Sequence, residues 1–423
     1  MEKACYKTDK FMITCWCGIP KRFIRRPDGT LAAERFIEMK DAGINLVPVS
    51  GYGVDGYDKE TVCEALALCE ELGLKVQLSD ERITRALNEP ENRRKLLEEV
   101  VRDYSGYPSL LNYYVVDEPK CERFPAVAEV CRILEEIDPV HETYVNILGN
   151  RAYEPFWGCK TYDEHVTRFM ETVKPGIISY DNYHFKKGAP LKDQTAPGVM
   201  FDGVKREKID LPGFLDNLEE IRAYSRKYSV PFMSIILVLE HVDYRDLSEA
   251  ELRYEVFTSL CSGVKRLSYF TYWEPYADRD PNWEHIVMLN MRGAMIQREG
   301  DRSHHYYEIA KINRELQAIG DVLLPYNVEN VFHIGEERDN KLIYWPGSFG
   351  DVTAVTASRA ELGFYEGGYL LLVNKDYESA SVVSLSIKVG KTASHYNKTT
   401  GLWEPSDGAL TIAAGDGELL RIL

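Results

Sequence analysis

Long apolar runs are absent from this sequence of 423 residues. No stretch reaches the roughly 18 consecutive apolar residues that a membrane-spanning helix needs, so we expect no membrane partner. An excess of positive charge is also missing, because 51 Lys and Arg residues stand against 67 Asp and Glu residues, a formal net charge of −16. Such a chain repels a phosphate backbone, and we expect no nucleic-acid partner. With 44% hydrophobic and 28% charged residues, the composition is that of a globular protein.

The first residues, MEKACYKTDKFMITCWCG, lack the basic region, apolar stretch and small-residue cleavage site of a secretory signal. The nine cysteines are an odd number, and several fall inside helix or strand patterns, which is typical of reduced thiols and predicts a cytoplasmic location. Cys15 and Cys17 stand two residues apart, but no second pair of ligands follows at zinc spacing. No HExxH, GxSxG or P-loop motif occurs either. We therefore expect no metal and no cofactor.

Strand-like runs alternate with amphipathic helical segments along the first three quarters of the chain. In the helical segments, such as residues 59–74 and 124–137, apolar residues recur every three to four positions. The strand-like runs begin near Phe11, Asn45, Lys75, Asn112, Glu142, Ile177, Pro231 and Lys265. Eight such strand–helix units predict a parallel (β/α)₈ TIM barrel. The widest gap, between Ile177 and Pro231, predicts an insertion on the catalytic rim after the sixth strand.

From about Pro325 the pattern changes to strand-like runs without intervening helices. Seven such runs begin near Asn327, Lys341, Gly367, Ser381, Ala393, Ala409 and Gly417. Short strands in series predict an all-β sandwich. We therefore expect two domains, a catalytic barrel over residues 1–324 and a C-terminal β-sandwich over residues 325–423.

The polar residues that end the barrel runs are the candidates for the active site, because the carboxyl ends of barrel strands meet at one mouth. Glu118 closes the fourth run, and Glu240 follows the apolar stretch SIILVL of the seventh. A carboxylate placed directly after six apolar residues is costly to bury unless something uses or satisfies it. Glycoside hydrolysis needs two carboxyl groups flanking one scissile bond. We predict that Glu118 and Glu240 are this pair.

With these residues the chain resembles the glycoside hydrolases of clan A, and in particular bacterial β-galactosidase-like barrels. The resemblance implies a retaining hydrolase that cleaves a β-linked glycoside or oligosaccharide, with Glu118 as acid/base and Glu240 as nucleophile. It also implies that Tyr183, in SYDNYHF, hydrogen-bonds the nucleophile, and that Trp273, in TYWEP, floors the subsite of the cleaved sugar. The remaining residues that we expect to bind substrate are Asp117, Asn146, Asp181, His184 and Glu274.

One residue departs from the clan pattern, in which asparagine usually precedes the acid/base. This chain has Asp117 there, and an ionised aspartate accepts hydrogen bonds but cannot donate them. The adjacent Asp117–Glu118 pair resembles hexosaminidases that use the substrate's own acetamido group as nucleophile. In that alternative Asp117 orients the acetamido group, Glu118 is the acid and Glu240 binds sugar.

Two alternatives belong to other functional classes. Gly51, Gly53 and Gly56 form a GxGxxG pattern with Asp80 ending the next strand, which favours an NAD-dependent oxidoreductase. Against it, Asp58 is expected to be the N-cap of the following helix, which leaves the glycines in a loop. A barrel that binds carbohydrate without cleaving it stays open as well.

Overall fold

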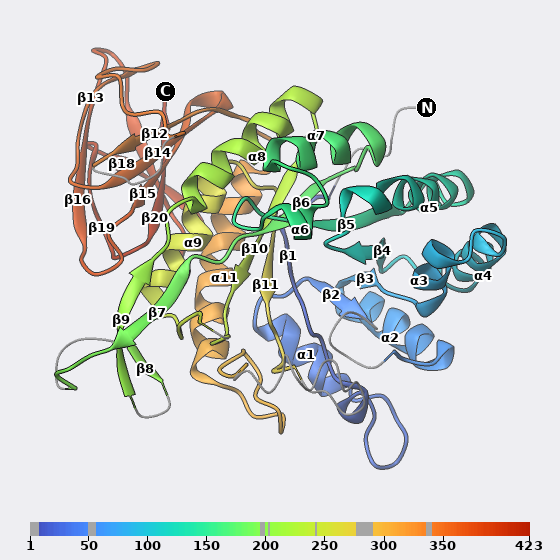
Figure 1. Cartoon of the computed structure of the whole chain (residues 1–423). Coiled ribbons are helices and arrows are strands. Elements are labelled where there is room, and N and C mark those ends of the chain that lie inside the picture. Colours follow the sequence, from blue (N-terminus) through green and yellow to red (C-terminus); the bar gives the residue numbers. More distant parts are fainter. Residues whose placement is uncertain are drawn as a thin grey trace.

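The computed structural model describes residues 8–49, 56–194, 199–201, 204–241, 243–275, 291–335 and 341–423. Its central element is a parallel eight-stranded sheet in the order β1-β11-β10-β6-β5-β4-β3-β2. The strands are β1 (Met12–Cys15), β2 (Leu46–Val49), β3 (Lys75–Leu78), β4 (Leu110–Asp117), β5 (Glu142–Leu148), β6 (Ile178–Asp181), β10 (Phe232–Leu237) and β11 (Arg266–Phe270). The backbone N–H of Ile13 donates to Asn45 Oδ1 (2.7 Å), and that of Asn45 donates to the Ile13 carbonyl (3.1 Å). These bonds join β1 to the start of β2, so the predicted TIM barrel is confirmed as a nearly closed sheet (Figure 1).

Helices surround the sheet, and capping side chains mark where several of them begin. They are α1 (Ala33–Asp41), α2 (Lys59–Leu72), α3 (Glu81–Asn88), α4 (Arg93–Tyr104), α5 (Phe124–Ile137), α6 (Glu154–Trp157), α7 (Tyr162–Thr172), α8 (Phe214–Tyr228), α9 (Glu249–Cys261) and α11 (His304–Leu323), with single 3₁₀ turns η1 (Lys21–Phe23), η2 (Cys121–Arg123) and η3 (Glu366–Gly368). The Asp58 side chain accepts from the Thr61 N–H, which confirms the expected N-cap of α2. Ser248 and Glu251 form a capping box at α9. None of the described helices is long and apolar enough to cross a membrane.

The long gap after the sixth strand contains an insertion, as predicted, and this insertion forms an antiparallel sheet. It consists of β7 (Phe185–Pro190), β8 (Val199–Phe201) and β9 (Val204–Asp210) in the order β7-β9-β8, and it projects from the barrel in Figure 1. Arg245, which is fully buried, anchors its base through ion pairs with Asp210 (2.8 Å) and Glu251 (2.6 Å). The insertion therefore starts and ends at fixed points on the mouth of the barrel.

The C-terminal part is a two-layer β-sandwich, which confirms the predicted fold class. One sheet has the order β12-β14-β15-β20-β17-β18 and the other β13-β16-β19. The strands are β12 (Val328–Ile334), β13 (Val352–Thr356), β14 (Ala360–Tyr365), β15 (Tyr369–Asn374), β16 (Ser381–Ile387), β17 (Ala393–Asn397), β18 (Leu402–Ser406), β19 (Ala409–Ile412) and β20 (Gly417–Ile422). The run expected from Lys341 contributes a bridge between Tyr344 and His333 rather than a strand, whereas β13 and β14 were not expected.

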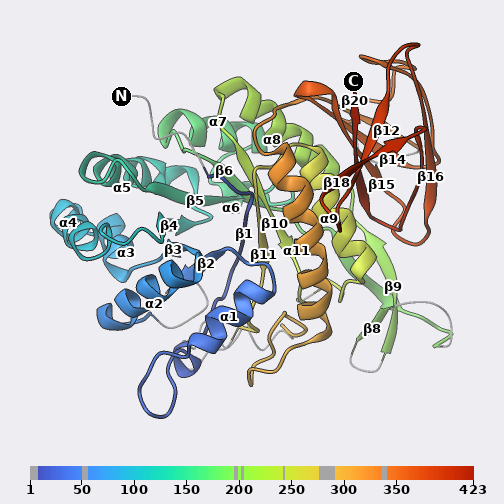
Figure 2. The same cartoon turned by 180° about the vertical axis from the view of Figure 1, so that it is seen from behind.

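The sandwich packs against the barrel through α9. Gly363 on β14 permits the approach, because a Cβ atom there would lie 2.6 Å from the Cys261 carbonyl oxygen at the end of α9. Figure 2 shows α9 and α11 between the barrel strands and the sandwich. Helix α11 ends at Leu323 and β12 begins at Val328. The division into domains at residue 324 stays a prediction.

Candidate active site

Asp117, Asn146 and Asp181 meet at the carboxyl ends of three neighbouring strands. Asp117 ends β4 and pairs in register with Asn146 of β5, while Asp181 ends β6. The Asn146 amide nitrogen donates to Asp117 Oδ1 (3.0 Å) and to Asp181 Oδ1 (3.1 Å). One buried amide thus uses both of its N–H groups to hold two carboxyl groups side by side.

Hydrogen bonds to buried side chains fix the orientation of this amide. Its oxygen accepts a hydrogen bond from Ser179 Oγ (2.8 Å), and Ser179 Oγ is 2.9 Å from the Tyr144 hydroxyl. All three of these side chains are buried. Because the amide oxygen is engaged by a hydroxyl donor, the nitrogen must face the two carboxyl groups. The network therefore positions Asp117 and Asp181 for a ligand above them.

Glu118 directly follows β4 in an unusual backbone conformation. Its φ of 44° lies in the left-handed region, which residues other than glycine adopt rarely, and its N–H donates to the Asn146 carbonyl (2.9 Å). A non-glycine residue held there costs free energy, and such residues cluster at functional sites. The conformation is thus an independent indication that Glu118 has a functional role.

A cavity of about 160 Å³ lies at this mouth and collects five of the predicted site residues: Asp117, Glu118, Asn146, Asp181 and Tyr183. The other side chains lining it are Trp16, Ile235, His241, Phe270 and Met291. Among these described lining residues there is no lysine or arginine. Three carboxyl groups thus share a small space with aromatic and apolar walls.

The electrostatics of this cavity favour protonated carboxyl groups. Desolvation raises the pKa of Glu118, although the residue is exposed at the cavity mouth, and the negative charges of Asp181 and Asp117 raise it further. Burial also raises the pKa of Asp117, with Asp181 adding to the effect, and burial raises the pKa of Asp181 itself. Glu118 is the most shifted of the three, and its hydrogen bond to Asp181 favours the neutral Glu118 carboxyl as donor. The cluster therefore favours the protonated form of Glu118.

Glu240, the predicted partner of Glu118, does not line this cavity. Its side chain is buried after β10 and forms two ion pairs, Oε1 with Lys187 Nζ (3.0 Å) and Oε2 with Arg292 Nε (3.0 Å). Its backbone also pairs with that of Arg292. Lys187 comes from β7 of the insertion, so Glu240 links the insertion to the loop at Arg292. The nucleophilic role of Glu240 stays a prediction.

The other three predicted site residues also lie outside the described lining of the cavity. Trp273 is 0% exposed and packs on Phe23 (ring centroids 4.8 Å apart) and under the Arg35 guanidinium (5.2 Å). Glu274 accepts backbone N–H bonds from Gly293 (2.7 Å) and Arg298 (3.2 Å). In this arrangement Trp273 has no face free for a sugar, and Glu274 holds the loop that follows.

His184 is buried beneath the mouth rather than open to it. Its ring stacks on Phe214 (4.3 Å between centroids), and Nδ1 lies 3.2 Å from Glu255 Oε1. Burial lowers the pKa of His184 to about 3 and raises that of Glu255. Burial thus favours the neutral form of both groups, and packing is the role that these contacts support. The substrate-binding roles assigned to His184, Trp273 and Glu274 stay predictions.

The remaining side chains of the cavity were not among the residues expected to act on or bind the substrate. Trp16 directly follows β1 and meets Tyr114 edge-on (5.7 Å), and His241 directly follows Glu240. Burial lowers the pKa of His241 to about 4, so its imidazole is neutral. The position directly after a barrel strand was the available signal for Trp16. Met291 follows a stretch outside the described residues, and its neighbour Arg292 is the one that contacts Glu240.

The sequence predicted no cofactor site and no metal site. Most of the glycine pattern falls outside the described residues. Residues 50–55, with Gly51 and Gly53, lie outside the described residues. Two groups of possible metal ligands occur among the described side chains: Cys121, Cys159 and His165, all buried, and Asp246, His304 and His305. Neither group lines the cavity at Glu118.

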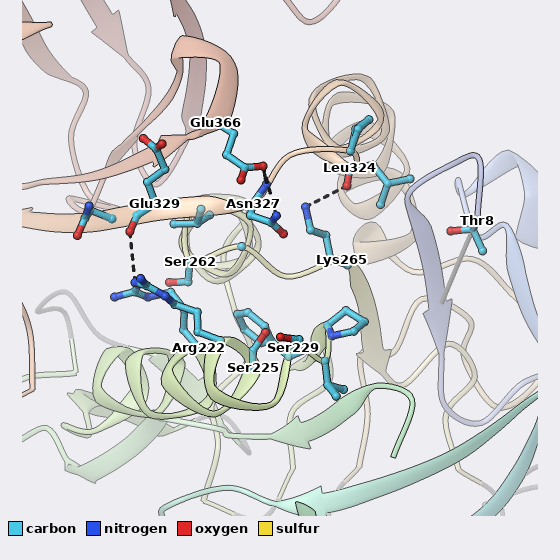
Figure 3. Close-up of a pocket in the computed structure, with 18 of the residues that line it drawn as sticks. Thr8, Arg222, Ser225, Ser229, Ser262, Lys265, Leu324, Asn327, Glu329 and Glu366 are labelled. Carbon is cyan, nitrogen blue, oxygen red and sulfur yellow. Dashed lines mark hydrogen bonds between the residues drawn. The ribbon is translucent and has the colours of Figure 1, made fainter. Parts of the chain in front are cut away.

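A larger cavity of about 1190 Å³ opens at the other end of the barrel, between α8 and the sandwich (Figure 3). Three of its charged groups have hydrogen-bond partners: Lys265 Nζ donates to the Leu324 carbonyl (3.0 Å), Arg226 donates to the Glu329 carbonyl (3.3 Å), and the Glu366 carboxylate accepts from Asn327. It lies at the amino ends of the strands, before β10 and β11. The Glu118 cavity is therefore the candidate active site.

Comparison with solved structures places the fold among glycoside hydrolases. A β-galactosidase from Bacillus circulans sp. alkalophilus superposes with a TM-score of 0.60 at 10% identity, covering 98% of this chain and 99% of that one. The family 42 β-galactosidase Gan42B from G. stearothermophilus gives 0.59 at 9% identity, covering 99% of each chain. A family 5 glycoside hydrolase from Bacteroides vulgatus gives 0.57 at 12% identity, covering 98% and 88%.

At these identities the likeness shows the fold, and the resemblance to clan A barrels is confirmed at that level. No protein-family model matches the sequence. No curated protein sequence matches it either. Fold and site thus define a TIM barrel with an appended β-sandwich, similar in fold to solved glycoside hydrolases, and the family stays unassigned.

Proposed function

We propose that this protein hydrolyses O-glycosidic bonds of a β-linked glycoside or oligosaccharide in the Glu118 cavity. The observation that carries the proposal is the grouping of Glu118 with Asp117 and Asp181 in one cavity at the carboxyl ends of barrel strands, where desolvation and the two neighbouring carboxyl groups raise the pKa of Glu118. A neutral carboxylic acid is what the glycosidic oxygen needs when the bond to the sugar breaks. Similar solved structures named β-galactosidases favour a β-linked substrate.

In the first step Glu118 donates its proton to the leaving oxygen while a nucleophile attacks the anomeric carbon. In the second step the Glu118 carboxylate removes a proton from water, and the water oxygen replaces the nucleophile. The proton balance returns Glu118 to its starting form. Two attacks at the same carbon retain its configuration, so the proposed enzyme is a retaining one.

Two groups are candidates for the nucleophile. In the two-glutamate route Glu240 attacks, and its carboxylate must then lie about 5 Å from that of Glu118. Both Glu240 oxygens are engaged, by Lys187 and by Arg292, which lowers the availability of its lone pairs. Each oxygen keeps a second lone-pair site, so this route needs one of these sites to face the anomeric carbon when substrate binds.

In the second route the substrate supplies its own nucleophile, the oxygen of a 2-acetamido group. Asp117 then accepts the acetamido N–H, and Glu118, the next residue, protonates the leaving group. The observation favouring this route is that Asp117 and Glu118 line one cavity whereas Glu240 does not. The acidic side chain at position 117, in place of the usual asparagine, serves as such an acceptor.

The two routes separate when paired variants are tested on two substrate sets. Dinitrophenyl β-galactoside and β-glucoside form one set, and the matching 2-acetamido glycosides form the other. The substrate-assisted route predicts turnover of the acetamido set alone, with Asp117→Ala more damaging than Glu240→Ala. The two-glutamate route predicts turnover of the plain glycosides, loss of it in Glu240→Ala, and rescue by azide with inverted product.

Glu122→Ala is the matched control, because Glu122 is an exposed carboxylate four residues beyond Glu118 on the same loop. Wild-type turnover of this control shows that loss of an arbitrary acidic residue nearby is harmless. Sugar binding without turnover of either set, measured by calorimetry, would overturn the hydrolase proposal in favour of a binding barrel.

A further inference from the structure

Three buried side chains with metal-binding atoms converge in the barrel wall next to the loop that carries Glu118. Cys121 begins η2, three residues beyond Glu118, Cys159 lies between α6 and α7, and His165 is on α7. Their exposed fractions are 6%, 8% and 0%, and their ligand atoms all lie within 4.8 Å of one another. Two thiols and an imidazole form a donor set that soft and borderline cations prefer.

The spacing of these atoms fits a single tetrahedral ion. Cys121 Sγ is 3.5 Å from His165 Nδ1. With Zn–S and Zn–N bonds of about 2.3 and 2.05 Å, two ligand atoms at a tetrahedral angle are roughly 3.6 Å apart. The sequence alone does not reveal this match, because Cys159 lies 38 positions after Cys121 and no short motif contains all three ligands.

The backbone holds the two thiol-bearing loops together without a metal. Gly158, with φ of 71°, lies so close to the neighbouring loop that a Cβ there would be 3.2 Å from Lys120 Cβ and 3.3 Å from the Cys121 nitrogen. The Thr161 side chain caps α7 by accepting from the Glu164 N–H (3.1 Å), which fixes the helix that carries His165. The donor set is therefore preformed by the fold.

The second group of possible ligands lacks these properties. His305 already uses both ring nitrogens, with Asp246 (2.8 Å) and with Glu308 (2.8 Å). Asp246 and His304 are exposed, at 43% and 57% of their side chains. That group is accounted for as ion pairs at the start of α11.

We propose that Cys121, Cys159 and His165 bind one thiophilic cation of the Zn²⁺ type, with solvent completing the coordination. The bound ion joins η2, which follows Glu118, to the start of α7, and so braces the loop that carries the proposed acid. The expectation of no metal came from the Cys15–Cys17 pair and from local spacing, and it did not consider this set. The proposal stands independently of the glycosidase proposal.

Co²⁺ titration of chelator-treated protein tests the site directly. We expect one equivalent per chain, with the near-ultraviolet charge-transfer band that thiolate ligands give. Cys121→Ser and His165→Gln should each weaken Co²⁺ binding by about 100-fold or more, since even outer-shell changes cost 10–100-fold. Cys69→Ser is the matched control, because Cys69 is a buried thiol on α2 outside the group, and it should bind Co²⁺ as wild type does.

Cadmium NMR on wild-type protein keeps the test decisive if a variant fails to fold. A resonance in the range of mixed sulfur and nitrogen ligation supports the site, and an oxygen-only resonance or none overturns it. A Cys121–Cys159 disulfide in peptide maps of protein kept in reducing buffer would also overturn it. Turnover plays no part in these readouts, so failure of this proposal and failure of the glycosidase proposal remain distinct.

Discussion

The acidic residues in the two halves of the barrel mouth have opposite electrostatic surroundings. Above β4 to β6, the carboxyl groups of Asp117, Glu118 and Asp181 gather around one amide, with no cation among the described residues that line the cavity. Above β10 and β11, Glu240 is matched by two cations, and Glu274 by two backbone N–H groups.

This difference separates carboxyl groups that can exchange protons from those that hold structure. A carboxylate paired with cations is stabilised in its charged form, whereas clustered carboxyl groups without a cation resist ionisation. The first half therefore holds the carboxyl group with the raised pKa, Glu118. The proposed chemistry lies on that half, and the other half serves to fix the insertion and the loop near Arg292.

The largest effect that we expect comes from removing the proton donor. Glu118→Gln should lower kcat/KM on substrates with poor leaving groups by about 10²–10⁴-fold, the usual contribution of general acid catalysis. On dinitrophenyl glycosides the loss should be smaller, because that leaving group needs little protonation. Steady-state kinetics on both substrate types measure this contrast, with Glu122→Gln as control. Equal losses on both types would count against Glu118 as the acid.

The fold could be predicted because its signals are local and repeated. The barrel strands alternate with helices of regular period, and Asp58 and Ser248 mark helix starts by their side chains alone. In the sandwich, β14 escaped prediction because Glu361 and Gly363 interrupt its apolar pattern, although both are enclosed between α9 and the sheet. There tertiary packing overrides the local pattern.

The site could be predicted only in part, because the direction of a side chain beyond a strand end depends on distant residues. Asp117, Asn146 and Asp181 lie within their strands, where register places them together. Glu240 is placed by Lys187 and Arg292, which come from an insertion and a loop that no local pattern connects to it. Trp273 is covered by Phe23 and Arg35 from the first helical turns of the chain.

The next prediction concerns the half of the mouth above β10 and β11, where Glu240 is paired with cations, and it is tested by measuring stability. Glu240→Gln leaves the Lys187 ammonium, whose side chain is 5% exposed, without its carboxylate. Breaking a buried ion pair from one side costs about 3–5 kcal/mol of unfolding free energy. Urea unfolding should show this loss, and Lys187→Met in the same chain should recover much of it. Unchanged stability together with abolished turnover would instead support Glu240 as nucleophile.

On the half where Asp117, Glu118 and Asp181 cluster, we expect a smaller change in the free energy of unfolding, of opposite sign. Because the pKa of Asp181 is raised in the fold, its contribution to stability is complete below the unfolded value, near pH 4, and is lost as pH rises through the folded value. Asp181→Asn removes this loss and keeps an oxygen that accepts from Asn146. We expect it to stabilise the fold by about 1–2 kcal/mol at pH 8 and by much less at pH 4.

Thermal unfolding across this pH range measures the difference, with Asp243→Asn as control. The Asp243 carboxylate is 55% exposed and paired with Lys186, so that change should not stabilise the protein. A gain for Asp181→Asn that is the same at both pH values would show that ionisation at this position carries no penalty. The carboxyl groups above β4 to β6 would then not differ from Glu240 and Glu274 in their resistance to ionisation.

The smallest effect separates the two tryptophans of the mouth. Trp16 lines the cavity, and an aromatic ring in contact with a sugar ring contributes roughly 0.5–1.5 kcal/mol, so Trp16→Leu should raise KM by about 3–10-fold. Trp273 packs only on Phe23 and Arg35 among the ring contacts described, so Trp273→Leu should lower the melting temperature and leave KM unchanged. KM and melting temperature measured on both variants give the comparison. A raised KM in Trp273→Leu at unchanged stability would restore its predicted role as the sugar platform, and would mean that Phe23 and Arg35 move away from the ring when substrate binds.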